Sequence, residues 1–244
     1  MENFMKIDSQ KLLDRFQSYV KIDTQSDENS STYPSTEKQL ELSRLLFKEL
    51  QQMGLAEVEM TEHGYVFATL PSNLPADKAE KVPILGFIAD VDTSPDVSGA
   101  NVKPLIHKNY QGQEIVLPED PTQKIGLETD PALKNCLGHD IITADGTTLL
   151  GADNKAGIAE IMSAVDYLKN NPSLKHGTIK VAFTVDEEIG TGTKYFDVET
   201  FGAKYAYTID GETAGEIEDF LCIYKEDITK VGRGSGRNKG CASW

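Results

Sequence analysis

Cysteine is scarce in this 244-residue chain, which contains only Cys136, Cys222 and Cys241. An odd count without any C-x-x-C spacing argues against a disulfide framework and against a structural cysteine zinc site. Long apolar runs are also missing, since none approaches the roughly 20 residues of a membrane span. The first 20 residues carry acids within their apolar stretch and lack the apolar core of a signal peptide. We therefore expect a cytoplasmic protein that does not enter a membrane.

Positive charge is in short supply as well. The chain has 24 Lys and Arg residues against 39 Asp and Glu residues, a formal net charge of −15. Such an acid excess argues against nucleic acid as a partner, because phosphate binding needs basic patches. It fits a solvated surface or a site that concentrates carboxylates around metal ions. With 39% hydrophobic residues, the chain is long enough for one large or two small globular domains.

Helical periodicities alternate with apolar runs that are typical of buried strands. This alternation predicts an α/β fold, a three-layer α/β/α arrangement around a mixed sheet. The stretch from Thr36 to Gln39 has the pattern of a capping box at the start of a helix. Residues 98–142, rich in Pro, Gly and Asn, are expected to be irregular. The expected helices cover residues 9–21, 40–50, 158–168 and 194–201, and the expected strands cover 57–60, 65–70, 84–89, 178–185 and 205–209.

Acidic residues follow the expected buried strands. Carboxyl ends of parallel strands line one crevice of an open α/β sheet, so these side chains are expected to converge. Like charges at such range cannot all stay ionised in a dry cleft, and two divalent cations would neutralise them. The six residues are Asp90 and Asp92 after 84–89, Asp153 before the helix at 158, Glu187 and Glu188 after 178–185, and Asp210 after 205–209.

Each of these acids also has an ordinary structural explanation. Asp210-Gly211 alone is typical of a turn, Glu187-Glu188 of a solvated loop, and Asp153 of a helix cap. The combination of four acidic groups, each at a strand end, favours a metal site. The four histidines, His63, His107, His139 and His176, lie in polar or loop contexts and are expected to be surface or loop residues.

Five stretches carry a family resemblance, and they are ADVDTSPD (89–96), NYQGQEIVL (109–117), DGTTLLGADNKAGIAEI (145–161), FTVDEEIGTG (183–192) and YTIDGETAGEIE (207–218). They closely resemble the peptidase T family, the tripeptide aminopeptidases within a larger group of two-zinc exopeptidases. The resemblance runs almost continuously from about residue 5 to 220.

This resemblance implies a role for each acid. Asp153 would bridge two zinc ions, Asp210 would complete the shell of the first, and Glu188 would ligate the second. Glu187 would be the general base, and Asp92 would orient the ligand at position 90. The resemblance also implies a cis peptide bond between Asp153 and Asn154.

The chain departs from the family pattern at two points. The family has histidine at position 90, where this chain has Asp90. Aspartate can bind zinc, yet its hard, negative oxygen shifts preference towards Mn or Mg. The family also continues beyond the end of this chain with a dimerisation domain and a late zinc-binding histidine, so we expect a truncated chain whose homodimer formation is in doubt.

We therefore expect residues 1–220 to be part of a two-zinc exopeptidase catalytic domain, and residues 221–244 to be a divergent, poorly ordered tail. The function implied is a zinc aminopeptidase that releases the N-terminal residue from tripeptides. Two alternatives stay open. One is a non-catalytic fragment or cation-binding remnant, and the other is a dipeptidase or another exopeptidase of the same group.

Overall fold

The fold is built on a five-stranded sheet in a computed structural model that describes residues 7–210. The predicted tail at 221–244, and the last ten residues of the predicted catalytic segment, lie outside these residues. The sheet order is β1 (Ala56–Met60), β2 (Val66–Leu70), β8 (Ile179–Thr184), β3 (Leu85–Asp90) and β9 (Tyr205–Thr208). Strands β1, β2 and β8 run antiparallel, whereas β8, β3 and β9 run parallel. The expected α/β class and mixed sheet are confirmed, and three parallel strands end at one edge.

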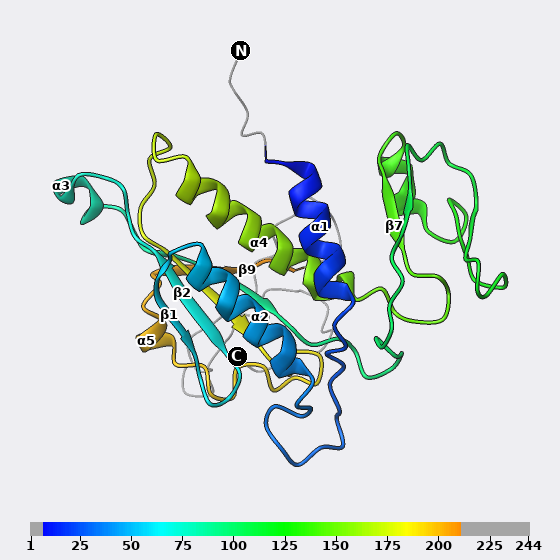
Figure 1. Cartoon of the computed structure of the whole chain (residues 1–244), viewed down its shortest axis with the longest axis horizontal. Coiled ribbons are helices and arrows are strands. Elements are labelled where there is room, and N and C mark those ends of the chain that lie inside the picture. Colours follow the sequence, from blue (N-terminus) through cyan, green and yellow to red (C-terminus); the bar gives the residue numbers. More distant parts are fainter. Residues whose placement is uncertain (1–6, 211–244) are drawn as a thin grey trace, which may run out of the picture.

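Three helices cover one face of the sheet (Figure 1), namely α1 (Ser9–Val20), α2 (Gln39–Gln52) and α4 (Ala152–Asn170). Helix α4 packs on β3, α2 packs on β1 and β2, and α1 packs on α4. Leu46, Ile158 and Phe183 are completely buried between these layers. Of the helices between residues 7 and 210, none combines the length and apolarity needed to cross a bilayer.

The opposite face carries the short helix α5 (Val198–Phe201). The helix predicted over residues 194–201 is therefore wrong for its first four residues. It starts late because Asp197 is the N-cap and accepts a hydrogen bond from the backbone N–H of Thr200 at 3.0 Å. Phe201 packs against Ile88 and Ala182 of the sheet.

The predicted capping box at residues 36–39 is also wrong. Helix α2 begins at Gln39, and no side chain caps it. The Thr36 hydroxyl donates to the carbonyl of Gln25 at 2.8 Å. The Gln39 amide donates to the carboxylate of Asp186 at 2.6 Å. Both side chains serve long-range contacts that compete with the local cap.

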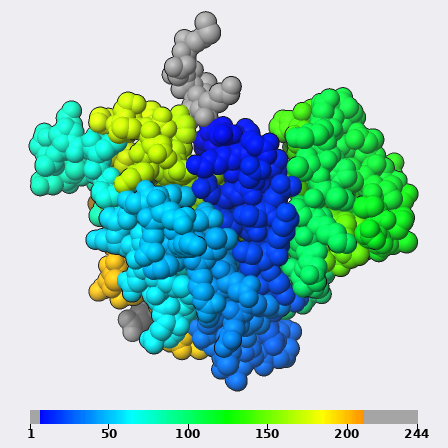
Figure 2. Space-filling model, viewed as in Figure 1, coloured from blue at the N-terminus to red at the C-terminus, as the bar shows by residue number. Residues whose placement is uncertain are grey.

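Residues 98–145 form a lobe beside α1, visible as the green bulge in Figures 1 and 2. Two small antiparallel pairs shape it, although the sequence predicted only irregular structure. Its own hydrophobic cluster is centred on the buried Tyr110, Ile115 and Leu133. The short elements are β4 (Leu105–His107), β5 (Ile115–Val116), β6 (Lys124–Ile125), η1 (Pro131–Cys136) and β7 (Ile141–Thr143), and a further short helix, α3 (Ala76–Ala79), precedes β3.

The packing of α5 depends on the absence of a side chain at Gly86. A Cβ atom there would lie 2.6 Å from the Phe201 ring. We predict that Gly86→Ala lowers the free energy of unfolding by about 1–3 kcal/mol, because the ring or the strand must shift. Chemical denaturation measures the change. Gly126→Ala is the matched control, since a Cβ there meets nothing closer than 3.9 Å. An equal loss in both variants would contradict this account.

Candidate metal centre

The end of β3 places two buried carboxylates, Asp90 and Asp92, at the edge where the three parallel strands end. Asp90 accepts a hydrogen bond from the Asn154 side-chain amide at 2.9 Å. Asp92 accepts one from the backbone N–H of Glu187 at 2.9 Å and one from that of Glu188 at 3.2 Å. The two acids therefore connect the end of β3 to the start of α4 and to the loop after β8.

Asp153 is brought to the same edge by an irregular start of helix α4. Gly151 has a φ of 74°, and Asp153 and Asn154 have non-helical dihedral angles. The peptide bond between Asp153 and Asn154 is cis, as the resemblance implied. This start directs the Asn154 amide to Asp90, while Asp153 remains partly open to solvent.

Ile209, the residue after β9, lies in direct contact with the second turn of α4. A Cβ atom on Gly157 would lie 2.1 Å from the carbonyl oxygen of Ile209 and 2.4 Å from the side-chain oxygen of Asn154. Only glycine allows this approach. Asp210 follows Ile209 directly, so Gly157 sets how closely Asp210 can come to Asp153.

Glu187 and Glu188 lie on a tight loop after β8. Asp186, which precedes them, is buried and has a φ of 57°. The loop closes through hydrogen bonds from Gly190 N–H to the Glu187 carbonyl at 2.7 Å and from Thr191 N–H to the Asp186 carbonyl at 3.0 Å. Both glutamate side chains are half-buried and face the same edge as Asp92.

The acids raise one another's pKa values, which shows that they are electrostatic neighbours. Burial raises the pKa of Asp92 to about 7, in part offset by its backbone hydrogen bonds. Burial, then the charge of Asp210, raises the pKa of Asp153 to about 6. Burial, then the charges of Asp153 and Asp92, raises the pKa of Glu188 to about 7.

The remaining two shifts have the same causes. Burial, followed by the charge of Asp92, raises the pKa of Asp90 well above its ordinary value. Burial and the charge of Asp210 raise the pKa of Glu187. Six carboxylates thus share one edge of the sheet without enough positive charge nearby, which is the electrostatic condition that a bound divalent cation relieves.

The described residues supply carboxylate donors for a metal ion, but they do not form a complete set of ligands around one position. Within residues 7–210, no three side chains of His, Cys, Asp or Glu are gathered closely enough to hold one metal ion. The donor set itself is suitable, because carboxylate oxygens bind Zn²⁺, Mn²⁺ and Mg²⁺. Histidine takes no part: His107, for example, bonds Thr143 in the lobe, and His63 stacks on Tyr195.

Sequence reasoning missed Lys155, a buried cation beside the acids. Its ammonium donates to the carbonyl of Ile22 at 2.8 Å, and only 1% of the residue is exposed. Burial lowers its pKa to about 8, against the opposing charges of Asp23, Asp92 and Asp90. The only available signal was its place two residues after Asp153, which does not distinguish a buried lysine from a solvated one.

Comparisons with known proteins relate this chain to peptidases. Residues 144–224 match peptidase family M20/M25/M40. Peptidase T of Alkaliphilus oremlandii is 56% identical over 207 residues, which is 85% of this chain and 50% of that protein. Peptidase T of Bacillus pumilus is 54% identical over 209 residues, or 86% of this chain and 50% of that protein. The chain spans about half the length of the curated relatives it matches.

Solved structures agree in fold. Aminopeptidase PepT from Bacillus cereus superposes with a TM-score of 0.59 and 27% identity, over 85% of this chain and 44% of that chain. A tripeptidase from Staphylococcus aureus superposes with a TM-score of 0.57 and 28% identity, over the same shares of each chain.

The close approach at Gly157 leads to a first prediction for the site. Gly157→Ala should destabilise the chain by roughly 1–3 kcal/mol or more, because the added methyl group meets a backbone carbonyl that cannot rotate away. Chemical denaturation measures the loss, with Gly126→Ala again as control. A wild-type free energy of unfolding would mean that β9 does not touch α4 in this way.

The raised pKa values predict how stability depends on pH. Unfolding returns Asp92, Asp153 and Glu188 to ordinary pKa values near 4, so between about pH 4 and 7 the folded chain binds more protons than the unfolded chain. The contribution of these three acids to stability is therefore fully present below about pH 4 and is lost as the pH rises through about 6 to 7. Thermal unfolding in EDTA from pH 5 to pH 8 tests this.

Two variants locate the source of that slope. Asp153→Asn should flatten it, because one of the titrating carboxylates is removed. Asp140→Asn, an exposed acid paired with Lys108 in the lobe, should leave it unchanged. Rising stability from pH 5 to pH 8 in the unmodified chain would show that the acids are not clustered as described.

Proposed function

Since the chain is a relative of peptidase T in the M20 metallopeptidase family, we propose that its acidic edge is part of the two-metal site of an aminopeptidase that releases the N-terminal residue from tripeptides. The observation that carries the proposal is the meeting of acids from β3, α4, β8 and β9 at one edge, each raising the pKa of others. Short peptides are the substrate class that the relatives' names support.

Metal binding is assigned to four of the six acids. Asp90, Asp153, Glu188 and Asp210 are the residues that would hold the metal ions. The ion is zinc by family resemblance, with Asp90 shifting preference towards Mn²⁺ because an aspartate oxygen is a harder donor than imidazole. When bound, the metals polarise the scissile carbonyl and acidify water.

Glu187 is assigned the proton transfer. Its carboxylate is half-buried, has a raised pKa and makes no hydrogen bond to another side chain within residues 7–210. It is therefore available to take a proton from water and return it to the leaving amine. Asp92 positions Glu187 and Glu188 by accepting hydrogen bonds from their backbone N–H groups. Its predicted role in orienting Asp90 stays a prediction.

A second candidate function is a cation-binding protein without turnover. It rests on the same convergence of acids at one edge, and metal uptake without hydrolysis distinguishes it. A dipeptidase of the same group is a further alternative, separated by the length of peptide cleaved. For either peptidase we propose a cytoplasmic location, which the small number of cysteines supports.

Metal uptake is the first test, because it does not require turnover. Adding Mn²⁺ or Zn²⁺ should raise the thermal unfolding temperature, and more so at pH 8 than at pH 5, because protons compete for the same oxygens. Asp153→Asn should remove most of this shift, whereas Asp140→Asn should retain it. A shift that is equal in both variants would place the metal elsewhere.

Hydrolysis is the second test. Release of free alanine from Ala-Ala-Ala by the metal-loaded chain should fall roughly 10²–10⁴-fold in Glu187→Gln, the range for loss of a general base, while the metal-induced thermal shift persists. Dipeptide and tetrapeptide substrates define the preferred length. Metal uptake without any hydrolysis would support the non-catalytic candidate.

Position 90 supplies the third test. Asp90→His replaces an anionic oxygen donor by a neutral nitrogen, so it should strengthen Zn²⁺ binding relative to Mn²⁺. A titration of both metals by calorimetry measures the ratio. An unchanged Zn²⁺/Mn²⁺ preference would show that the residue at 90 does not ligate metal.

A further inference from the structure

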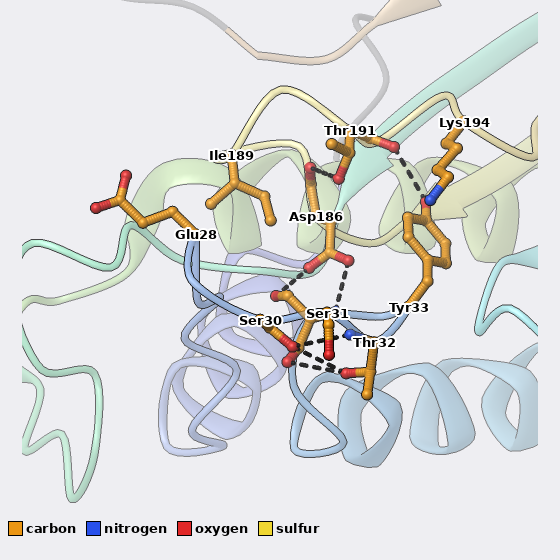
Figure 3. A pocket seen from close by; sticks show the side chains of 10 residues that line it. Glu28, Ser30, Ser31, Thr32, Tyr33, Asp186, Ile189, Thr191 and Lys194 are labelled. Atoms are coloured by element: carbon orange, nitrogen blue, oxygen red, sulfur yellow. Dashed lines mark hydrogen bonds between the residues drawn. The ribbon is translucent and has the colours of Figure 1, made fainter.

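A small cavity lies beside the acidic edge, between the segment 28–35 and the loop 186–194 (Figure 3). Its volume is about 180 Å³, and hydroxyl groups make up much of its wall. One water molecule occupies about 30 Å³ in the liquid, so the cavity has room for a carboxylate with several attached carbons. Neither its hydroxyls nor its charged residues belong to the proposed metal set.

Two acids line the cavity, Glu28 and Asp186, and the carboxylate of Asp186 already has hydrogen-bond donors. Its carboxylate accepts hydrogen bonds from the backbone N–H of Ser35 and the side-chain amide of Gln39, both at 2.6 Å, and one from the Ser35 hydroxyl. A carboxylate with three donors attracts a further cation only weakly. The other charged residues that line the cavity are Glu28 and one lysine, so the positive charge that attracts an anion can come only from the lysine.

Lys194 supplies that charge. Its ammonium lies over two aromatic rings, 5.5 Å from the ring centre of Tyr33 and 5.1 Å from that of Tyr195. In the part of the chain between residues 7 and 210, this ammonium has no ion-pair partner and no hydrogen-bond acceptor. Glu28 stands at the opposite side of the cavity (Figure 3). An ammonium has three donors, and no acceptor within residues 7–210 uses those of Lys194.

The wall under Lys194 is fixed in place. The Tyr33 hydroxyl lies 2.6 Å from that of Tyr65 and donates to the Thr191 carbonyl at 3.2 Å. The Tyr195 ring stacks on His63 with centroids 3.9 Å apart. These contacts hold both rings, and the rings favour a cation above them.

The cavity and the acidic edge are neighbours along the chain. Asp186 is followed directly by Glu187, and consecutive Cα atoms are only about 3.8 Å apart. A ligand in the cavity would therefore contact the same loop that carries the residue assigned to proton transfer. An anionic substrate is repelled by a chain of net charge −15, so an unpaired ammonium at this point would have a specific use.

We propose that this cavity binds a carboxylate group of the peptide substrate, with Lys194 as its charged partner. The inference rests on the proposed peptidase function and extends it by naming the substrate group recognised beside the site. The carboxylate can come from the C-terminus of the peptide or from an acidic side chain, and the chemistry of recognition is the same for both.

NMR titration of the full 244-residue chain with peptides, in EDTA, measures binding and tests the proposal without turnover. Three probes separate the sources: Ala-Ala-Ala, its C-terminal amide, and Ala-Glu-Ala amide. We expect one of the two carboxylate-bearing probes to bind more tightly than the Ala-Ala-Ala amide. Lys194→Met should remove that difference, weakening binding roughly three- to tenfold, the range for a partly exposed ion pair.

Two further variants serve as controls. Lys194→Arg keeps the charge and should retain binding. Lys204→Met removes another lysine that lies over a tyrosine ring, 5.9 Å from the centre of Tyr205, and should have no effect because it does not line the cavity. Circular dichroism verifies that each variant is folded.

The outcomes distinguish this inference from the function on which it rests. Equal binding of the three probes, or an equal loss in Lys194→Met and Lys204→Met, overturns the carboxylate site. Hydrolysis of the tighter-binding carboxylate probe with an unchanged KM in Lys194→Met overturns it while the peptidase function stands. Binding that depends on Lys194, in a chain that takes up no metal and cleaves no peptide, supports the carboxylate site and removes the proposed function.

Discussion

Two buried carboxylates at the end of β3 connect the segments that meet at the acidic edge of the sheet. Asp90 is bonded to the side chain of Asn154 in α4, and Asp92 to the backbone of Glu187 and Glu188 after β8. A buried acid is tolerated only when hydrogen bonds replace its hydration, so each of these bonds is needed for the fold as well as for the site. The segments that carry Asp153, Glu187 and Glu188 are positioned by the same bonds.

This arrangement accumulates negative charge at an edge where Asp90 and Asp92 are buried. The acids respond by holding their protons more tightly, which the raised pKa values of Asp153 and Glu188 express. A proton and a divalent cation are alternative ways to neutralise the same oxygens. Folding, protonation and metal binding are therefore linked, and the buried ammonium of Lys155 offsets only a small part of the charge.

The loop 186–194 serves two sites with opposite electrostatic character. Glu187 and Glu188 face the acidic edge, whereas Asp186, Thr191 and Lys194 line the cavity. The positive φ of Asp186 makes this division possible, because it reverses the chain between the buried strand and the two glutamates. The hydrogen bonds from Ser35 and Gln39 to Asp186 hold that conformation against the start of α2. The segment 28–35 therefore also helps to position the loop 186–194.

The sequence by itself determined the α/β class, the mixed sheet and the positions of the acids at strand ends, because apolar runs and the residues that follow them are local patterns. It also pointed to the relatives through motifs such as GADNKAG. Tertiary structure alone decided the partners: Gln39 bonds Asp186 instead of capping α2, Asp92 binds the backbone of a loop 95 residues away, and Lys155 is buried. Each of these depends on segments that meet only after the sheet has formed. A pattern in sequence specifies which residues can bond or ionise, whereas the free energy of burial, which selects among those options, exists only in the folded chain.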